Sequence, residues 1–406
     1  MAELRQNTWE LNKWYAEFVA ESTGGYNSVG DPGTLWMWGN NDSGKLGQNN
    51  RTSYSSPVQV GTGTWKSIAG TQNLSAINMD GELYTWGWND SVAYGMLGLN
   101  DTVTRSSPTQ IPGSWSRVTN IGLNGTNYYT SGAIKSDGTL WVWGTNSSGQ
   151  LGQNDKTQYS SPVQIAAPSG NWDKVNISQT AFAGIKDGKL YMCGRGGGGG
   201  LGQNTTGSGA YRSSPIQIPG TAWANIDVGD YGVTAFATKT NGTLWSWGYG
   251  SAGSSGVLGQ NNNGVLYSSP TQIGTGTNWA TDDGKLCAGD KNTACIKTDG
   301  TLWIWGSNQY GVLGLNVLGA RSSPVQIPGT TWDVVNIGGF TAWAQKTDGT
   351  QWAWGNNSSG ELAQNNAAPA VEAYSSPVQV PGFQVTFTNN GSTSGFSGGG
   401  AGFKSS

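Results

Sequence analysis

The residues of this chain that could do chemistry are few, and they occur in a regular pattern. Histidine is absent from the 406 residues, and an Asp-Gly or Asn-Gly pair recurs along the chain. The pairs begin at Asp80, Asp137, Asp187, Asn241, Asp299 and Asp348. Without histidine the chain lacks Ser-His and Cys-His nucleophile pairs, imidazole metal ligands and the usual general base at neutral pH.

Each of these pairs directly precedes an apolar run that carries tryptophan or tyrosine, which is the pattern of a hairpin turn. A type I′ turn needs φ > 0 at both central residues, and Asp-Gly or Asn-Gly meets that need. Turn geometry therefore accounts for the recurring acidic side chains. We predict that the chain is not an enzyme and that it has no catalytic residue, metal ligand or cofactor.

The three cysteines offer no alternative chemistry. Cys193, Cys287 and Cys295 are too few for a disulfide framework and lack the spacing of zinc ligands. Cys193 stands where other repeats have their second tryptophan. We interpret all three as small core residues.

The tryptophan-bearing run is the unit of an internal repeat. GTLWVWG at Gly138–Gly144 has seven related copies, which start 48 to 58 residues apart. They begin at Gly33, Gly81, Gly138, Gly188, Gly242, Gly300 and Gly349. Periods in this range are typical of propellers and of stacked arrays of small units.

Each period contains four short apolar segments bounded by Gly, Pro, Asn or Asp, and each segment reads as a strand. Four antiparallel strands make one propeller blade, so we predict an all-β, seven-bladed β-propeller over residues 25–388. Two N-terminal strands, Tyr26–Val29 and Thr34–Gly39, are expected to close the ring. They would pair with SSPVQV from Ser375 and with Phe383–Thr388 at the C-terminus.

The two ends of the chain differ from the repeats. Residues 1–24 predict a short amphipathic helix that anchors the chain on the propeller flank or on another subunit. The candidate anchor residues are Leu4, Trp9, Leu11, Trp14, Tyr15 and Phe18. Residues 389–406 form a Gly/Ser-rich tail that we expect to be flexible in isolation.

Composition narrows the classes of partner. Twenty-one basic and 24 acidic side chains give a net charge of −3, without the basic cluster that a phosphate backbone needs. We therefore expect no nucleic-acid partner. No apolar run approaches the 18 residues of a membrane span, and no basic-then-apolar signal segment opens the chain. We expect synthesis in a cytoplasm.

The full pattern DGTLWVWGTNSSGQLGQN from Asp137, followed by SSPVQI, resembles the regulator of chromosome condensation repeat family over about residues 26–388. The resemblance implies a seven-bladed propeller. Members include an exchange factor for a small GTPase that also docks on chromatin, and propellers that act as interaction platforms. Here no segment matches a GTPase-contacting insertion, and a basic chromatin-binding tail is absent.

A second resemblance concerns composition and the N-terminus. The near-identical, histidine-free and Asn/Gly/Ser-rich repeats are similar to propellers encoded by bacteria and their viruses. The opening NTWELNKWYAEFVA is similar to the start of structural proteins of tailed bacterial viruses.

Positions where the copies differ are the candidate contacts, because function on a propeller lies in loops that project from a constant frame. Aromatic residues without nearby charge could contact a protein or a glycan, or the loops could simply vary. The candidates are Trp88, Tyr94, Tyr128, Tyr129 and Tyr249.

These features predict a non-enzymatic propeller that is a structural or host-attachment component of a virus particle, in its tail or capsid. Its expected partners are other subunits of the assembly, with a cell-surface glycan or protein as a further partner. One alternative is a lectin-like carbohydrate-binding propeller, and another is a small-GTPase exchange factor or regulatory scaffold. The expected location is the virion, after synthesis in the host cytoplasm, and the alternative is the cytoplasm.

Overall fold

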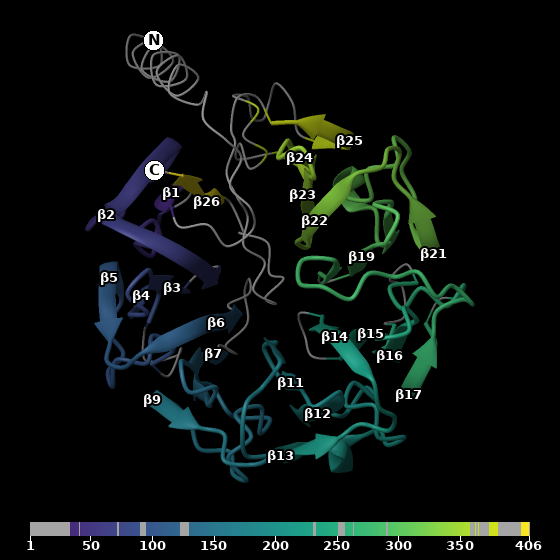
Figure 1. Cartoon of the computed structure of the whole chain (residues 1–406), viewed down its shortest axis with the longest axis horizontal. Coiled ribbons are helices and arrows are strands. Elements are labelled where there is room, and N and C mark those ends of the chain that lie inside the picture. The colour runs from purple at the N-terminus through teal and green to yellow at the C-terminus, as the bar shows by residue number, and fades with distance from the viewer. Residues whose placement is uncertain are drawn as a thin grey trace.

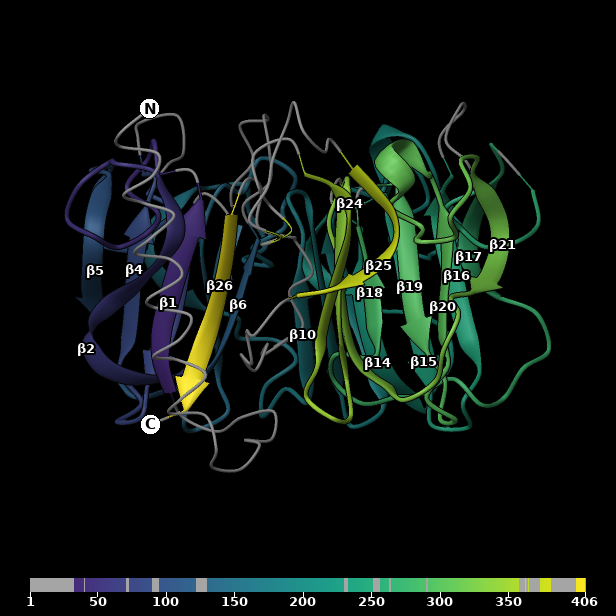
Figure 2. The same ribbon diagram turned by 90° about the horizontal axis from the view of Figure 1, so that it is seen from above.

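The strands form antiparallel sheets set around a common axis (Figure 1). Seen from the side, the strands run roughly along that axis (Figure 2). The structure is a computed structural model, and it describes residues 33–39, 41–70, 73–89, 95–121, 130–229, 233–250, 256–262, 264–289, 291–357, 362, 364, 373–380 and 399–405. The predicted N-terminal helix and its six anchor residues lie outside these ranges. The described residues contain two short 3₁₀ turns, η1 (Ser208–Ala210) and η2 (Gln309–Gly311), and no α-helix.

Five sheets have four strands each, and in each sheet the strands follow one another in sequence order. The first two of these sheets contain β6 (Trp115–Ile121), β7 (Thr130–Lys135), β8 (Leu140–Gly144) and β9 (Tyr159–Gln164), and then β10 (Lys174–Ile177), β11 (Ala181–Lys186), β12 (Lys189–Gly194) and β13 (Arg212–Gln217). The third contains β14 (Trp223–Val228), β15 (Thr234–Lys239), β16 (Leu244–Tyr249) and β17 (Leu266–Gln272). The last two contain β18 (Leu286–Ala288), β19 (Asn292–Ile296), β20 (Leu302–Gly306) and β21 (Arg321–Gln326), and then β22 (Trp332–Ile337), β23 (Thr341–Lys346), β24 (Gln351–Asn356) and β25 (Ala373–Gln379).

The prediction of seven blades is wrong, because the described strands form six sheets. The remaining sheet has six strands, in the order β26-β1-β2-β3-β4-β5. They are β26 (Gly399–Ser405), β1 (Gly33–Gly39), β2 (Tyr54–Gly70), β3 (Asn73–Asn78), β4 (Leu83–Gly87) and β5 (Arg105–Ile111). The physical reason is β2, whose 17 residues run without a break: its first part pairs with β1 and its second part with β3.

The predicted pairing of the chain ends was also wrong. SSPVQV from Ser375 does not join the N-terminal strands, since β25, which contains Ser375, is the last strand of its sheet and pairs with β24. The partner of β1 on its other side is β26, in continuous register from Gly33↔Ser405 to Gly39↔Gly399. The C-terminal residues predicted as part of a flexible tail therefore form a strand. Tyr26–Val29 and Phe383–Thr388 lie outside the described residues.

Two ends of the propeller can be distinguished by their connections. In each four-stranded sheet, the connections after the first and third strands lie at one end, which we call the loop face. The Asp-Gly turns after the second strand lie at the opposite end, which we call the turn face. The fourth strands β9, β13, β17 and β21 lie on the outer rim (Figure 1).

The second tryptophan of a copy holds neighbouring repeats together. It is fully buried, and its indole N–H donates to a carbonyl in the G-x-L-G loop that follows the preceding copy. The pairs are Trp86 with Lys45 (2.8 Å), Trp143 with Met96 (2.8 Å), Trp247 with Gly200 (2.9 Å), Trp305 with Val257 (2.7 Å) and Trp354 with Val312 (2.7 Å). The loop must approach closely: a Cβ on Gly98, where φ is +71°, would lie 2.8 Å from Trp143 Nε1.

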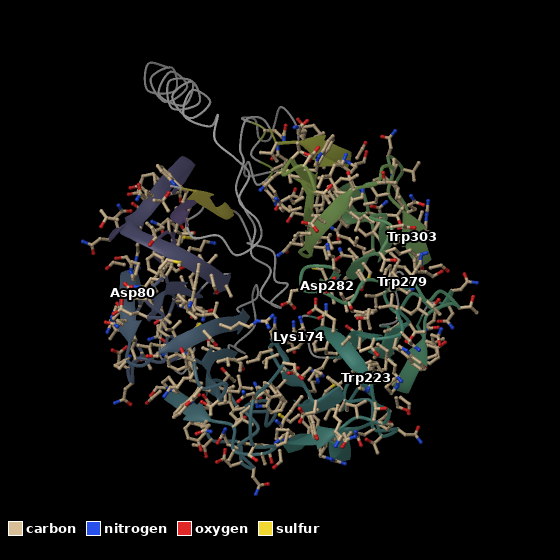
Figure 3. All side chains as sticks on the ribbon, in the orientation of Figure 1. Asp80, Lys174, Trp223, Trp279, Asp282 and Trp303 are labelled. Atoms are coloured by element: carbon tan, nitrogen blue, oxygen red, sulfur yellow. The ribbon has the colours of Figure 1, made fainter. Side chains whose placement is uncertain are left out.

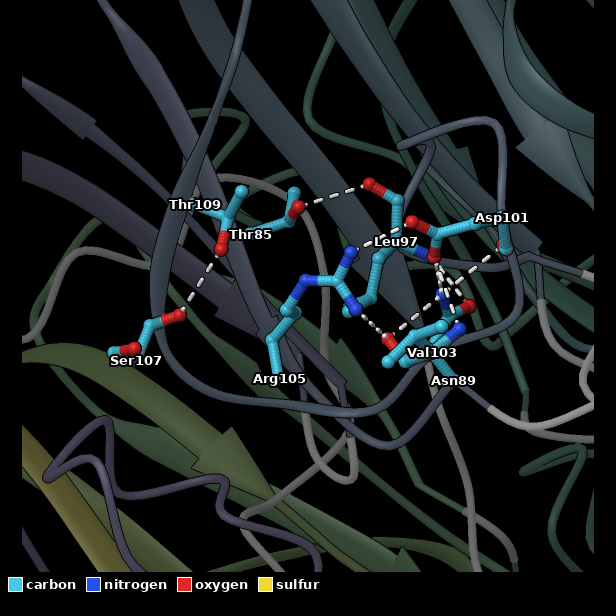
Figure 4. A network of polar contacts seen from close by, with 8 residues as sticks. All are labelled: Thr85, Asn89, Leu97, Asp101, Val103, Arg105, Ser107 and Thr109. Atoms are coloured by element: carbon cyan, nitrogen blue, oxygen red, sulfur yellow. Dashed lines mark hydrogen bonds and ion pairs between the residues drawn. The ribbon is translucent and has the colours of Figure 1, made fainter.

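A buried asparagine shapes this loop from within. The loops around Asn41, Asn89, Asn146, Asn308 and Asn357 all use the side-chain oxygen to accept from the backbone N–H of the loop leucine. Figure 4 shows the loop of Asn89, whose amide also donates to the carbonyls of Asp101 and Val103. Buried polar groups that are satisfied in this way specify one loop conformation.

The Asp-Gly turns are mostly not of the predicted type I′. Only Asp187 among the six residues has φ > 0, at 51°, followed by Gly188 at 67°. There the loop has two residues, because Lys186 pairs with Lys189. Around Asp137 the loop has three residues, with Gly138 N–H donating to the Lys135 carbonyl, so only the glycine needs φ > 0.

The repeat that lacks the second tryptophan shows how the core compensates. Cys193 is buried there, and its thiol lies 3.8 Å from the Gln150 carbonyl that an indole would otherwise contact. Phe182, fully buried, is its cross-strand partner and stacks edge-on against Trp172. The equivalent partners in the other sheets are smaller or aliphatic: Leu74, Ser131, Ala235, Thr293 and Ala342.

We predict that Cys193→Trp alone lowers the free energy of unfolding by about 1–3 kcal/mol, because the new ring overlaps Phe182. Phe182→Ala alone costs about 3–5 kcal/mol by opening a cavity. The double variant should recover much of both losses, since the indole then fills the cavity and reaches the Gln150 carbonyl. Urea unfolding of the wild type, the two single variants and the double variant measures the coupling between the two positions. Additive losses of unfolding free energy would contradict this prediction.

The acidic turn residues accept hydrogen bonds from the strand that follows. Asp137 Oδ1 accepts from Thr139 Oγ1 at 2.6 Å and from Thr139 N at 2.9 Å. The threonine hydroxyl bond is the main cause that holds the pKa of this carboxyl below its ordinary value, and the same holds at Asp299 and Asp348. These carboxylates are structural acceptors, as the turn interpretation predicts.

We predict that Thr139→Val raises the pKa of Asp137, because the stronger of its two bonds is removed. A carboxyl whose pKa is depressed by folding stabilises the protein above its unfolded pKa and loses that effect as pH falls through the folded pKa. The variant should therefore be less stable than the wild type at neutral pH, and this difference should disappear as pH falls through the folded pKa of Asp137. Carbon-13 NMR titration of the carboxyl groups measures the shift, with Asp299 as the internal control that should not move.

Candidate functional site

Among the described residues, no group of three or more His, Cys, Asp or Glu side chains gathers in a way that could hold a metal ion. Burial raises the pKa of the Cys193 and Cys295 thiols, so neither is an activated nucleophile. None of the three cysteines forms a disulfide and all three are buried, as the core interpretation predicts. No helix in the described part of the chain is long and apolar enough to cross a membrane.

One buried lysine has a strongly shifted pKa that its sequence context does not predict. Burial lowers the pKa of Lys45 to about 8, against the opposing effect of Asp42. Lys45 occupies the variable position of the G-x-L-G loop, whose carbonyl accepts from Trp86. Because only the carbonyl is needed there, the side chain at this position varies among copies, and its burial follows from loop packing.

Two of the predicted contact residues are described, and neither stands free. Trp88 is half-buried and packs against Met96. Tyr249 ends β16 and is half-buried, with its Cβ 3.1 Å from the place that a Cβ on Gly198 would take. Tyr94, Tyr128 and Tyr129 lie outside the described residues.

Most of the exposed large hydrophobic side chains in the described part of the chain lie on one face of three successive sheets. Six of the eight exposed large hydrophobic residues fall between residues 265 and 340. They are Val265, Leu266, Tyr310, Val317, Leu318 and Phe340, and we call them the apolar loop patch. All six precede or connect strands at the loop face of three successive sheets, β14–β17, β18–β21 and β22–β25 (Figure 1).

The centre of the apolar loop patch is an aromatic pair from two different sheets. Tyr310, in η2, and Phe340, between β22 and β23, meet edge to face with ring centroids 5.4 Å apart. They remain 43% and 40% exposed, and Leu318 is 76% exposed. Tyr310 has φ 56° and ψ 19°, a left-handed conformation that is uncommon for a bulky residue. Such strain clusters at sites of function.

The loops that carry this patch contain no charged side chain over residues 249–266 and 307–320. Interface cores are depleted of charge and enriched in aromatic residues. Contiguous apolar surface on a protein is a mark of an interaction site. Sequence reasoning missed these residues because valine and leucine beside a glycine-rich loop look like core; the uncharged composition was the available signal.

Comparison with protein families finds the regulator of chromosome condensation (RCC1) repeat at residues 32–77, 80–122, 137–184 and 299–337. A second description of the same repeat matches residues 285–312. The matched segments contain all or most of each of the strands β1–β6, β8–β11 and β18–β22.

Among characterised proteins, the chain is 25% identical over 299 residues to the human E3 ubiquitin-protein ligase HERC2, covering 71% of this chain and 6% of that protein. It is 27% identical over 320 residues to the mitochondrial RCC1 domain-containing protein RUG3 of Arabidopsis thaliana, covering 73% and 66%. The chain thus spans less than two thirds of each of these relatives.

Among solved structures, Prp20p from Saccharomyces cerevisiae has a TM-score of 0.76 at 17% identity, covering 97% of this chain and 95% of that one. Human WBSCR16 has a TM-score of 0.69 at 18% identity, covering 86% and 94%. At these identities the likeness shows the fold. The matched segments of this chain are therefore similar to the regulator of chromosome condensation repeat, and the fold is a β-propeller.

Proposed function

We propose that this chain is a non-enzymatic interaction propeller that docks a protein partner on the apolar loop patch. The observation that carries the proposal is the gathering of six exposed apolar residues, with an aromatic pair, on uncharged loops of one face. Rigid sheets held by buried indole bonds present these loops in a fixed arrangement. A preformed apolar surface binds with little ordering cost.

A protein surface fits the patch better than a glycan does. Four of its six residues are aliphatic, whereas sugar recognition needs an open aromatic face beside polar groups. The edge-to-face contact between Tyr310 and Phe340 also covers part of one ring. The candidate residues that still favour the lectin-like alternative are Tyr94, Tyr128 and Tyr129, which lie outside the described residues.

The virus-particle role and the virion location stay predictions. The similar proteins named above come from human, Arabidopsis thaliana and Saccharomyces cerevisiae. An interaction platform is compatible with a place in any assembly, and proteomics of purified particles would decide whether the chain is a component of one.

We predict that the double variant Leu318→Glu/Phe340→Glu binds its partner at least about tenfold more weakly, because two charges enter the desolvated centre of the contact. Met79→Glu is the matched control, since Met79 is 45% exposed but lies at the turn face, between β3 and β4. Proteins captured by the wild type and lost in the double variant are purified, and each affinity is measured by calorimetry. Equal binding by the double variant, or equal loss in the control, would remove the patch as the docking site.

The exchange-factor alternative has its own test. Prp20p binds Gsp1p and histones, which suggests purified Gsp1p as the probe. Exchange requires contacts that loosen a nucleotide held by its phosphates and Mg²⁺, and the apolar loop patch offers no charged group for them. We expect no acceleration of labelled GDP release from Gsp1p, and a concentration-dependent acceleration would favour the exchange function.

A further inference from the structure

One sheet carries an insertion in the strand that faces the propeller axis. In the sheet of β14–β17, Trp223 pairs with Lys239 and Ile226 with Ala237, three residues further along the strand. In the sheet of β18–β21, Trp279 pairs with Lys297, but Leu286, seven residues further along, pairs with Cys295. Four residues, Thr281–Gly284, are therefore added ahead of β18, with the sequence TDDG.

The insertion places a carboxylate between two basic side chains of other sheets. Asp283 Oδ2 accepts from Arg117 Nη2 at 2.9 Å, and Asp283 Oδ1 accepts from Lys174 Nζ at 2.5 Å. Arg117 belongs to β6 and Lys174 begins β10. Figure 3 shows Lys174 and Asp282 near the propeller axis. The carboxylate thus joins segments that are 166 and 109 residues apart in sequence.

The backbone of the insertion contacts the two remaining neighbours. The Asp282 carbonyl accepts from Asn225 Nδ2 of β14 at 2.9 Å. On the other side, the Gly284 carbonyl accepts from Val335 N of β22 at 2.9 Å. Directly after the insertion, Lys285 Nζ lies 2.5 Å from Asp333 Oδ1, also on β22. Together with the Asp283 contacts, the segment reaches four other sheets.

These contacts differ from ordinary surface ion pairs. The Arg117 and Lys174 side chains are 18% and 22% exposed, and Asp283 is 38% exposed, so water screens the charges only in part. One carboxylate uses both oxygens, and charge-assisted bonds of this kind are stronger than neutral ones. Gly284, with φ +77°, lets the segment turn back into β18 while it lies against Val334.

We propose that Thr281–Gly284 is an ionic clasp that locks the sheets of β6, β10 and β18 to one another across the propeller axis. Each sheet otherwise contacts mainly its two neighbours, so the frame can loosen one sheet at a time. The clasp couples the sheet of β18 to two sheets that are not its neighbours, and it makes their opening a joint event that depends on the Asp283 charge. The device is independent of the docking proposed above, because it uses none of the patch residues.

The test is hydrogen exchange of the folded full chain, measured by mass spectrometry, for wild type and Asp283→Asn. The substitution keeps the shape of the side chain and removes its charge. We expect exchange to become about tenfold faster in β6, β10 and β18 together. Faster exchange confined to residues 281–285 would overturn the proposal.

Asp101→Asn is the matched control. Asp101 pairs with Arg105 at 2.6 Å and comparable exposure, but both residues belong to one loop and the strand that follows it. Its loss should speed exchange in that loop alone. An equal and equally widespread effect of both variants would also count against the clasp.

Salt gives a measurement that needs no variant. Raising ionic strength from 0.15 to 1 M shortens the screening length from about 8 to about 3 Å. Wild-type exchange in β6, β10 and β18 should then approach that of Asp283→Asn, while the variant itself changes little. If salt does not change wild-type exchange in these strands, the clasp proposal is overturned. This result would be decisive even if Asp283→Asn failed to fold.

Discussion

The hydrogen bond from a buried indole to a loop carbonyl of the preceding repeat is the interaction on which this propeller depends. A buried N–H without a partner is costly, so each copy of the strand demands a carbonyl at one place in the loop before it. That demand explains the glycines that let the loop approach and the buried asparagine that shapes it. It also explains why the residue between glycine and leucine varies from copy to copy, as at Lys45, since only its backbone carbonyl is needed.

Local rules of the sequence were enough to predict the strands, the antiparallel sheets and the structural role of the Asp-Gly pairs. They failed where pairing is decided over long distances. Nothing in the sequence around Tyr54–Gly70 shows that one strand passes from β1 to β3 without a break. The glycine-rich strand Gly399–Ser405 looked flexible because it lacks the apolar side chains that mark strands, yet a ladder needs only backbone groups.

The candidate site was harder to predict than the fold, and for a related reason. Comparing copies draws attention to aromatic residues that break the pattern, such as Trp88 and Tyr249, but both are half-buried. Trp88 packs on Met96 of its own loop, and Tyr249 lies beside Gly198 of the preceding sheet. Val317 and Leu318 are aliphatic and therefore resemble core until the structure shows them exposed. The insertion at Thr281–Gly284 was hidden because loop lengths vary throughout. The spacing from Trp279 to Leu286 would have revealed it.

The distribution of charge gives the separation of frame and site a physical basis. Only 11% of the residues are charged, so solubility rests on asparagine, serine and glycine. Arg117, Lys174 and Asp283 form ion pairs near the axis, where they join sheets. The loops around the apolar loop patch keep no charge to discourage association. This combination of exposed apolar side chains and uncharged loops is the physical basis of the proposal that a protein partner covers the patch.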